Sequence, residues 1–131
     1  MRVLALDYGS ARTGVALSDA TGAVARPLCV VERAATEAGL SRVAALVEEH
    51  GAERVVVGLP LTLRGERGVQ ARETERFVEV LRRRLDVPVE TFDERFTTAL
   101  AARTASRAPE DARAAAHLLS GYLEWMSARV R

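Results

Sequence analysis

The sequence of 131 residues has no lysine, a single cysteine, few aromatic residues and no long hydrophobic run. One cysteine, Cys29, excludes an intrachain disulfide and fits a reducing compartment. Apolar runs stay short of the roughly 18 residues that a membrane-spanning helix needs, so membrane insertion is not expected. The opening MRVLALDYGS soon reaches an aspartate and lacks a small-residue cleavage site, so it predicts a strand and not an export signal. We therefore expect a cytoplasmic protein.

Arginine carries all of the basic charge. The chain contains 19 arginines and 18 acidic residues, which gives a formal net charge of +1. Arginine suits bidentate phosphate contacts, but a GC-rich genome produces the same bias together with abundant alanine, and we favour that explanation. A net charge near zero neither supports nor excludes a polyanionic partner, because recognition depends on where the charges lie. Aromatic residues make up 5% of the chain, which argues against a broad platform for stacking bases.

The order of the predicted elements indicates the fold class. We expect one domain over residues 1–131, with a core of its own. Hydrophobic patterns and turn residues predict three strands, then a helix, a strand, a helix, a strand and two helices, at 2–7, 13–19, 23–31, 37–51, 53–60, 69–85, 87–92, 96–105 and from Pro109 to about Met126. Pro27 favours an edge position or an irregularity in the third strand, and Gly51 suits a helix C-terminal cap.

This order predicts an α/β fold with a mixed five-stranded sheet flanked by helices. A three-strand antiparallel meander would be extended by two parallel strands, each reached through a helix. That is the order of a ribonuclease H-like domain.

The predicted topology would bring three acidic side chains to the same end of the sheet. Asp7 ends the first strand, Glu94 follows the fifth strand, and Asp111 begins the last helix. Hard divalent cations prefer oxygen ligands, and two-metal phosphoryl chemistry uses a few carboxylates of this kind. Ordinary structural roles stay open, because Asp7 could start a turn while Glu94 and Asp111 could favour helix N-termini. Asp93 has a supporting or strand-end position, and Glu110 is typical of a helix start.

Other groups of residues give weaker evidence for a functional site. The turn DYGSARTG lacks the lysine and the spacing of a P-loop, although Ser10 and Thr13 lie where they could contact phosphate. His50 and His117 are the only histidines, and neither has the partners of a zinc site.

Four blocks in order resemble the YqgF nuclease family, also called RuvX and described as Holliday junction resolvases. They are ALDYGSARTGVALSD, VVVGLPLTLRGERG, VETFDERFTT and DARAAAHLLSGYLE, and from the first to the last they span nearly the whole chain. The resemblance implies a ribonuclease H-like fold, a nuclease activity that depends on a divalent metal, and a role in maturing the 5′ end of 16S ribosomal RNA.

The resemblance also assigns roles to residues. The family's acids fall on Asp7, Glu94 and Asp111, which would bind Mg²⁺ or Mn²⁺ and be catalytic; one ion would help deprotonate the attacking water and the other would stabilise the leaving 3′ oxygen. Its loop after the fourth strand falls on 58–60. The expected contacts to nucleic acid are Ser10, Arg12, Thr62, Arg64, Arg67 and Arg95. The expected supporting residues around the acids are Asp93, Thr97 and Thr98.

The chain departs from the family's pattern in three places. Ala11 stands where relatives commonly carry a basic residue, although Arg12 keeps a positive charge nearby, and Thr62 replaces a usual asparagine. The connector ARTASRAPE before the last helix is short, which could narrow the range of substrates; Arg103 and Arg107 would still supply positive charge there, unless they simply form a solvated face.

The expected substrate is precursor ribosomal RNA, bound by a monomer or homodimer that does not contact membranes. One alternative is a Holliday junction resolvase that cleaves branched DNA as a symmetric dimer, with the last helix and Trp125 as a conceivable interface. The other is a ribosome-assembly factor that binds RNA without cleaving it.

Overall fold

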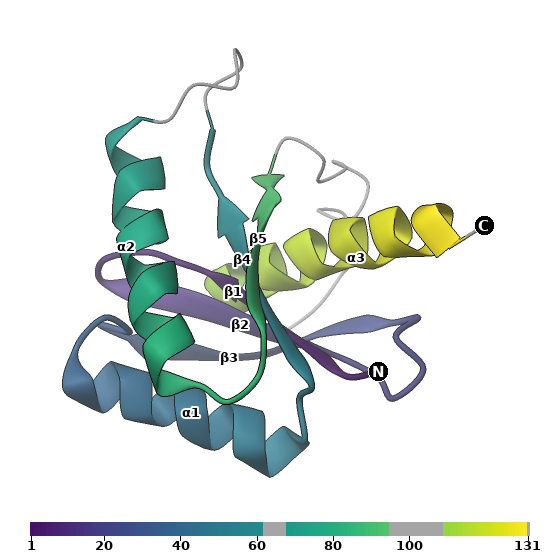
Figure 1. The fold of residues 1–131 in the computed structure, drawn as a ribbon, viewed down its shortest axis with the longest axis horizontal. Coiled ribbons are helices and arrows are strands. Elements are labelled where there is room, and N and C mark those ends of the chain that lie inside the picture. The colour runs from purple at the N-terminus through teal and green to yellow at the C-terminus, as the bar shows by residue number, and fades with distance from the viewer. Residues whose placement is uncertain (62–67, 95–108, 131) are drawn as a thin grey trace.

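The computed structural model describes residues 1–61, 68–94 and 109–130 of the chain. Within these residues five strands form one sheet, with helices on both of its faces (Figure 1). The strands are β1 (Val3–Asp7), β2 (Arg12–Ser18), β3 (Ala25–Glu32), β4 (Arg54–Leu59) and β5 (Val89–Asp93). The helices are α1 (Glu37–His50), α2 (Val69–Arg84) and α3 (Glu110–Val130). None of these helices is both long enough and apolar enough to cross a membrane.

The sheet has the strand order β3-β2-β1-β4-β5. β1 pairs antiparallel with β2, and β2 with β3, whereas β4 is parallel to both β1 and β5. The predicted meander with two parallel strands is therefore confirmed. Because β1, β4 and β5 run in one direction, their carboxyl ends meet at the same edge of the sheet, where ligands commonly bind in such folds.

Both faces of the central strands are buried. Successive side chains of a strand point to opposite faces, so Leu4 and Leu6 join the core under α1 and α2, and Val3 and Ala5 join the core under α3. Helices α1 and α2 lie on one side of the sheet and α3 lies on the other (Figure 1). This burial explains why β4 is apolar from Val55 to Leu59, because neither face of that segment meets water.

The helix boundaries follow local chemistry. The Thr36 hydroxyl accepts a hydrogen bond from the Gly39 backbone N–H at 3.2 Å, and α1 ends at Gly51, whose φ of 62° is left-handed. α3 runs four residues beyond the predicted end at Met126, to Val130. Its last turn is supported by the Arg129 guanidinium, which lies 4.6 Å from the centre of the Trp125 ring, four residues earlier.

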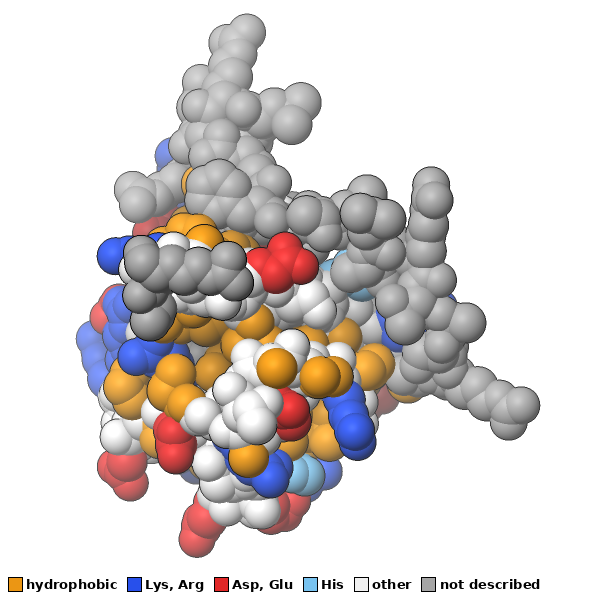
Figure 2. All heavy atoms as spheres, turned by 90° about the vertical axis from the view of Figure 1, so that its right-hand side faces the viewer, with side chains coloured by type: hydrophobic (Ala, Val, Ile, Leu, Met, Phe, Trp, Pro, Cys, Tyr) orange, Lys and Arg blue, Asp and Glu red, His pale blue; other side chains and the backbone are white. Residues whose placement is uncertain are grey.

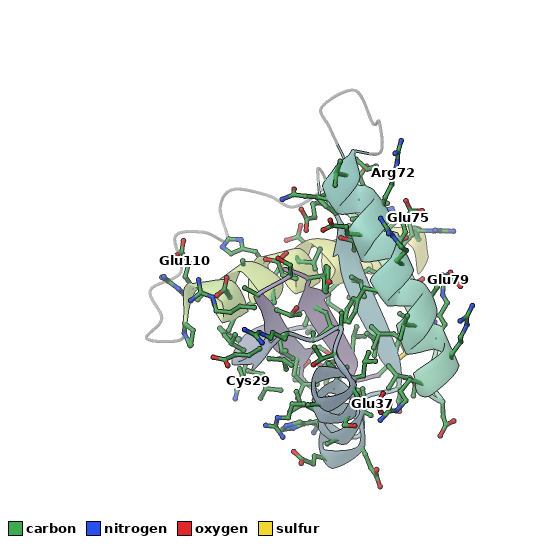
Figure 3. All side chains as sticks on the ribbon, turned by 90° about the vertical axis from the view of Figure 1, so that its left-hand side faces the viewer. Cys29, Glu37, Arg72, Glu75, Glu79 and Glu110 are labelled. Atoms are coloured by element: carbon green, nitrogen blue, oxygen red, sulfur yellow. The ribbon has the colours of Figure 1, made fainter. Side chains whose placement is uncertain are left out.

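A further prediction concerns β3, which contains Pro27. β3 is an edge strand, and the β2–β3 register shifts between Val15 and Ala16, next to the Ala16–Pro27 pair, so both expectations for Pro27 are confirmed. Figure 3 shows Arg72, Glu75 and Glu79 on the outer side of α2, directed away from the sheet. The helix predicted at 96–105 lies outside the described residues.

A polar group fixes the middle of α3 to the sheet. The Tyr122 side chain is 1% exposed; its hydroxyl donates to the Glu90 carboxylate and accepts from Arg54 Nη1 at 2.9 Å. We expect Tyr122→Phe to lower the free energy of unfolding by about 1–2 kcal/mol, because two half-buried charged groups lose a partner. Urea denaturation measures this change. Thr21→Val, which removes an exposed hydroxyl, is the control, and an equal loss in both variants would contradict the role of Tyr122.

Candidate functional site

The three predicted acids lie at the edge where the parallel strands end. Asp7 is the last residue of β1, Glu94 directly follows β5, and Asp111 is the second residue of α3. Gly14 pairs with Asp7 across β1 and β2, and a Cβ atom at Gly14 would lie only 1.8 Å from the Asp111 carbonyl oxygen. The first turn of α3 therefore packs directly against the strand residue beside Asp7, and this contact brings Asp111 close enough for its charge to act on Asp7.

Asp7 and Glu94 share a hydrogen bond, in which protonated Glu94 donates to the Asp7 carboxylate. Burial, the charge of Asp7, this hydrogen bond and the charge of Asp93 together raise the pKa of Glu94 to about 7. Burial also raises the pKa of Asp7, with Asp111 adding to the rise, while the hydrogen bond from Glu94 acts in the opposite direction. The two partly buried acids therefore interact directly, and their proximity disfavours the state in which both are ionised.

The Asp111 carboxylate forms an ion pair with the Arg12 guanidinium. Its Oδ2 lies 3.3 Å from Arg12 Nε, at the start of β2. The Arg12 side chain is 67% exposed and that of Asp111 is 39% exposed, so solvent weakens this ion pair and its contribution to stability is small. Arg12 therefore lies at the acid cluster, and its guanidinium is accessible to a ligand.

The three acids differ in how well their arrangement and their chemistry fit a divalent metal. Among the described residues, no group of three or more His, Cys, Asp or Glu side chains is arranged to hold one ion as it stands. The chemistry of the donors nevertheless fits, because Asp7, Glu94 and Asp111 offer only hard oxygen ligands, and the first two share a proton that a divalent cation would replace. Asp111 would have to exchange Arg12 for the ion.

A cavity of about 230 Å³ opens beside Asp7 and Glu94. One wall is formed by residues 8–10, and the buried Thr13 hydroxyl supports this segment by donating to the Gly9 carbonyl at 3.3 Å. Gly9 is required there, because a Cβ atom would lie 2.4 Å from the Arg12 carbonyl oxygen. The cavity is lined by Asp7, Tyr8, Gly9, Ser10, Pro60, Gln70, Glu73, Thr74 and Glu94.

Helix α2 supplies a wall of this cavity that was not predicted from the sequence. Gln70, Glu73 and Thr74 lie in the first two turns of α2, one turn apart along one side of the helix. The only signal in the sequence for these three residues was their position at the start of a helix that follows a glycine-containing loop. That signal is weak, because polar residues at helix starts are common on any protein surface. Burial, and to a lesser extent the charge of Glu73, raise the pKa of the Tyr8 hydroxyl.

Some of the other predicted contact residues are described by the structure, and the rest lie outside the described residues. Ser10 is exposed and lines the cavity, and Asp93 ends β5, where its charge acts on Glu94. The resemblance placed Gly58 in the loop after the fourth strand, whereas the structure places it within β4. There it packs closely against Glu94, because a Cβ atom would lie 2.7 Å from Glu94 Oε1. The predicted contacts outside the described residues are Thr62, Arg64, Arg67, Arg95, Thr97 and Thr98.

A larger cavity lies elsewhere. It measures about 830 Å³ and is formed by the N-terminus, the 21–23 turn and the C-terminal half of α3. Hydrophobic side chains gather on that face of the molecule (Figure 2). None of the predicted site residues lines it, so we place the site by its acids and not by cavity size.

The shared proton predicts how stability depends on pH in the absence of metal. Between the ordinary value of 4.5 and about 7, the folded chain keeps a proton on Glu94 that the unfolded chain has lost. Stability from this pair is therefore fully present below pH 4.5 and is lost as pH rises through about 7. Glu94→Gln keeps a donor to Asp7 without a charge, so it should be more stable than the wild type at alkaline pH.

Urea denaturation in EDTA, from about pH 5 to about pH 8, measures this effect. We expect the difference in stability between Glu94→Gln and the wild type to grow across that range. Glu53→Gln, at an exposed glutamate away from the acids, should give a difference that does not change with pH. A constant difference for Glu94→Gln as well would show that Glu94 is already ionised in the folded protein.

Comparison with known proteins decides the family. The family profile described as "RuvX: Holliday junction resolvase" matches residues 1–125. The chain belongs to the RuvX family. All three acids lie within the matched region, as do Arg12 and the residues that line the cavity.

RuvX relatives with curated names agree with this assignment. A protein of Chloroflexus aurantiacus named "Putative pre-16S rRNA nuclease" is 50% identical over 99 residues, a match that covers 76% of this chain and 65% of the relative. This chain thus spans just under two thirds of that relative's length. A protein of the same name from Anaeromyxobacter sp. is 43% identical over 134 residues, covering 95% of this chain and 97% of the relative.

Solved structures show the fold of this RuvX chain. Thermus thermophilus RuvC in complex with a Holliday junction substrate matches with a TM-score of 0.68 and 19% identity, over 98% of this chain and 96% of that one. The Fowlpox virus resolvase in complex with Holliday junction DNA matches with a TM-score of 0.51 and 11% identity, over 100% of both chains. The predicted ribonuclease H-like fold is confirmed.

Proposed function

We propose that this chain is a nuclease that depends on a divalent metal and hydrolyses phosphodiester bonds in the precursor of 16S ribosomal RNA, in the cytoplasm. The observation that carries the proposal is the contact between Asp7 and Glu94 at one end of the sheet, with Asp111 close enough for its charge to act on Asp7, in a chain of the RuvX family. The names of relatives that match nearly full length favour RNA as the substrate.

Asp7, Glu94 and Asp111 would hold Mg²⁺ or Mn²⁺ through their carboxylate oxygens. Bound there, one or two such ions would supply an activated water and stabilise the leaving 3′ oxygen. Asp7 and Glu94 give up their shared proton when the site is loaded, so loading favours neutral or alkaline pH. Arg12, released from Asp111, is placed to contact a phosphate oxygen of the substrate.

The remaining contacts belong to the loops around the acids. Ser10 lines the cavity and would donate a hydrogen bond to the RNA backbone. The expected contacts Thr62, Arg64, Arg67 and Arg95 would add charge and hydrogen bonds to the same backbone. Asp93, Thr97 and Thr98 would support the acids without binding the ion directly.

A second candidate function is the resolution of Holliday junctions. The description of the family and the fold match to RuvC favour it. The same acids would cleave DNA, but a resolvase needs two sites facing opposed strands and hence a symmetric dimer. The two functions differ in substrate and assembly, and share the chemistry at Asp7, Glu94 and Asp111.

One experiment compares these functions. Wild-type protein, Asp111→Asn and Glu110→Gln are incubated with labelled precursor RNA, duplex DNA and a four-way junction, each with Mg²⁺, Mn²⁺ or EDTA. Glu110 is the matched control, because it is the exposed acid next to Asp111 in the first turn of α3 (Figure 3). We expect RNA cleavage by the wild type and Glu110→Gln, none in EDTA, and a large loss for Asp111→Asn.

Other results would redirect the assignment. Paired nicks in the junction, together with a dimer on gel filtration, would favour the resolvase. Tight RNA binding without cleavage under any metal condition would favour an assembly factor that binds RNA and would end the nuclease proposal.

A further inference from the structure

A second cavity lies next to the cavity that contains the acids. Its volume is about 240 Å³, and the two cavities share Tyr8 and Glu73. Tyr8 directly follows Asp7 in the chain, so a ligand in the second cavity touches the residue beside a catalytic acid. The second cavity is lined by Tyr8, Ala35, Glu73, Arg76, Phe77 and Val80.

The lining of this cavity fits a flat, largely apolar group with a polar edge. Two rings and two aliphatic side chains supply most of its surface, and Glu73 and Arg76 supply one charge of each sign. A phosphate would meet a carboxylate there, and a metal ion would find a single acidic ligand among apolar groups, so neither fits. A nucleobase fits, because it stacks on aromatic or guanidinium planes and has donors and acceptors at its edge.

Tyr8 is held in place before any ligand arrives. Its ring stacks on Phe77, with centroids 4.3 Å apart and planes 20° apart. Phe77 is 2% exposed and belongs to the core under α1 and α2, whereas Tyr8 is only partly buried. A fixed ring loses little conformational entropy when a base packs against it, which favours binding.

We propose that the cavity formed by Tyr8, Phe77, Arg76 and Val80 binds one nucleobase of the substrate strand, from a nucleotide next to the cleaved phosphate. This inference rests on the proposed function, because it needs a phosphodiester at Asp7 and Glu94. Glu73 accepts a hydrogen bond from the edge of the base, and Arg76 packs on the base or contacts the next phosphate. A single base subsite agrees with the low aromatic content, which excludes only a broad platform.

An abasic scan tests the subsite. The affinity of the protein for single-stranded RNA is measured in EDTA by fluorescence anisotropy, with the base removed at one position at a time. We expect one position, adjacent to the bond cut with Mg²⁺, at which removing the base weakens binding roughly tenfold. Tyr8→Leu should bind intact RNA roughly tenfold more weakly and lose its sensitivity at that position, whereas Tyr8→Phe should match the wild type.

A pair of surface variants covers the case in which Tyr8→Leu does not fold. Val80 is 40% exposed and lines the cavity, and Val24 is 50% exposed in a turn at the start of β3. Val80→Trp fills the cavity and should behave like Tyr8→Leu, while Val24→Trp should behave like the wild type. A flat scan for the wild type, or unchanged sensitivity in Val80→Trp, would overturn the subsite.

The outcomes separate the subsite from the nuclease assignment. Normal cleavage with a flat abasic scan would refute the subsite alone. A sensitive position in EDTA, with no cleavage under any metal condition, would support the base-binding cavity and refute the nuclease.

Discussion

Asp7→Asn is expected to lower the rate of RNA cleavage by about a thousandfold or more, because metal-ion catalysis is worth several kcal/mol and each 1.4 kcal/mol is about tenfold. Asparagine keeps the size of the side chain and removes the charge that would bind a cation. The fold should survive, because Asp7 is held beside two other acids and loses repulsion when it becomes neutral.

The measurement is single-turnover cleavage of labelled RNA over a range of Mn²⁺ concentrations, with the melting temperature as a check on folding. Asp86→Asn, at an exposed aspartate away from the site, is the matched control and should cleave at the wild-type rate. Wild-type activity from pure Asp7→Asn protein would show that Asp7 does not bind the metal, and it would leave the proposed mechanism without its first ligand.

Gly14→Ala is expected to have the largest effect on the fold. A Cβ atom at this position would lie 1.8 Å from the Asp111 carbonyl oxygen, 2.3 Å from its carbonyl carbon and 3.0 Å from the Ala112 nitrogen. These are backbone atoms, so no change of rotamer relieves the clash and α3 must move away from β2. We expect the free energy of unfolding to fall by about 3 kcal/mol or more.

The same substitution should also abolish cleavage, because Asp111 moves away from Asp7 together with the first turn of α3. Urea denaturation and RNA cleavage at a temperature where the variant stays folded measure the two effects. Gly68→Ala is the control, since a Cβ atom there meets nothing within 4 Å. A Gly14→Ala protein as stable and active as the wild type would contradict the contact between β2 and α3.

The sequence predicted the sheet and the three acids because those features depend on local chemistry. The apolar run of β4 and the acid that ends β1 depend on burial and strand direction, which residue types indicate. Pro27 predicted an edge strand for the same reason, since proline has no N–H for a second ladder.

Contacts between distant segments were not predictable in this way. Gly14 looks like any strand glycine until α3 packs on it, and Glu73 looks like any exposed helix acid until α2 is placed beside Tyr8. Arg12 was predicted to contact nucleic acid, and the structure shows it 3.3 Å from Asp111. The sequence shows that Arg12 is charged, but tertiary packing decides which oppositely charged group lies close to it.

The most direct test of the proposed function is a crystal structure of the protein grown with Mn²⁺ and measured at a wavelength where manganese scatters anomalously. We predict anomalous density among the carboxylates of Asp7, Glu94 and Asp111, with Arg12 turned away from Asp111, and no such density in crystals of Asp7→Asn. Manganese bound elsewhere, or the Asp7–Glu94 hydrogen bond unchanged at saturating Mn²⁺, would contradict the metal site and the nuclease mechanism that depends on it.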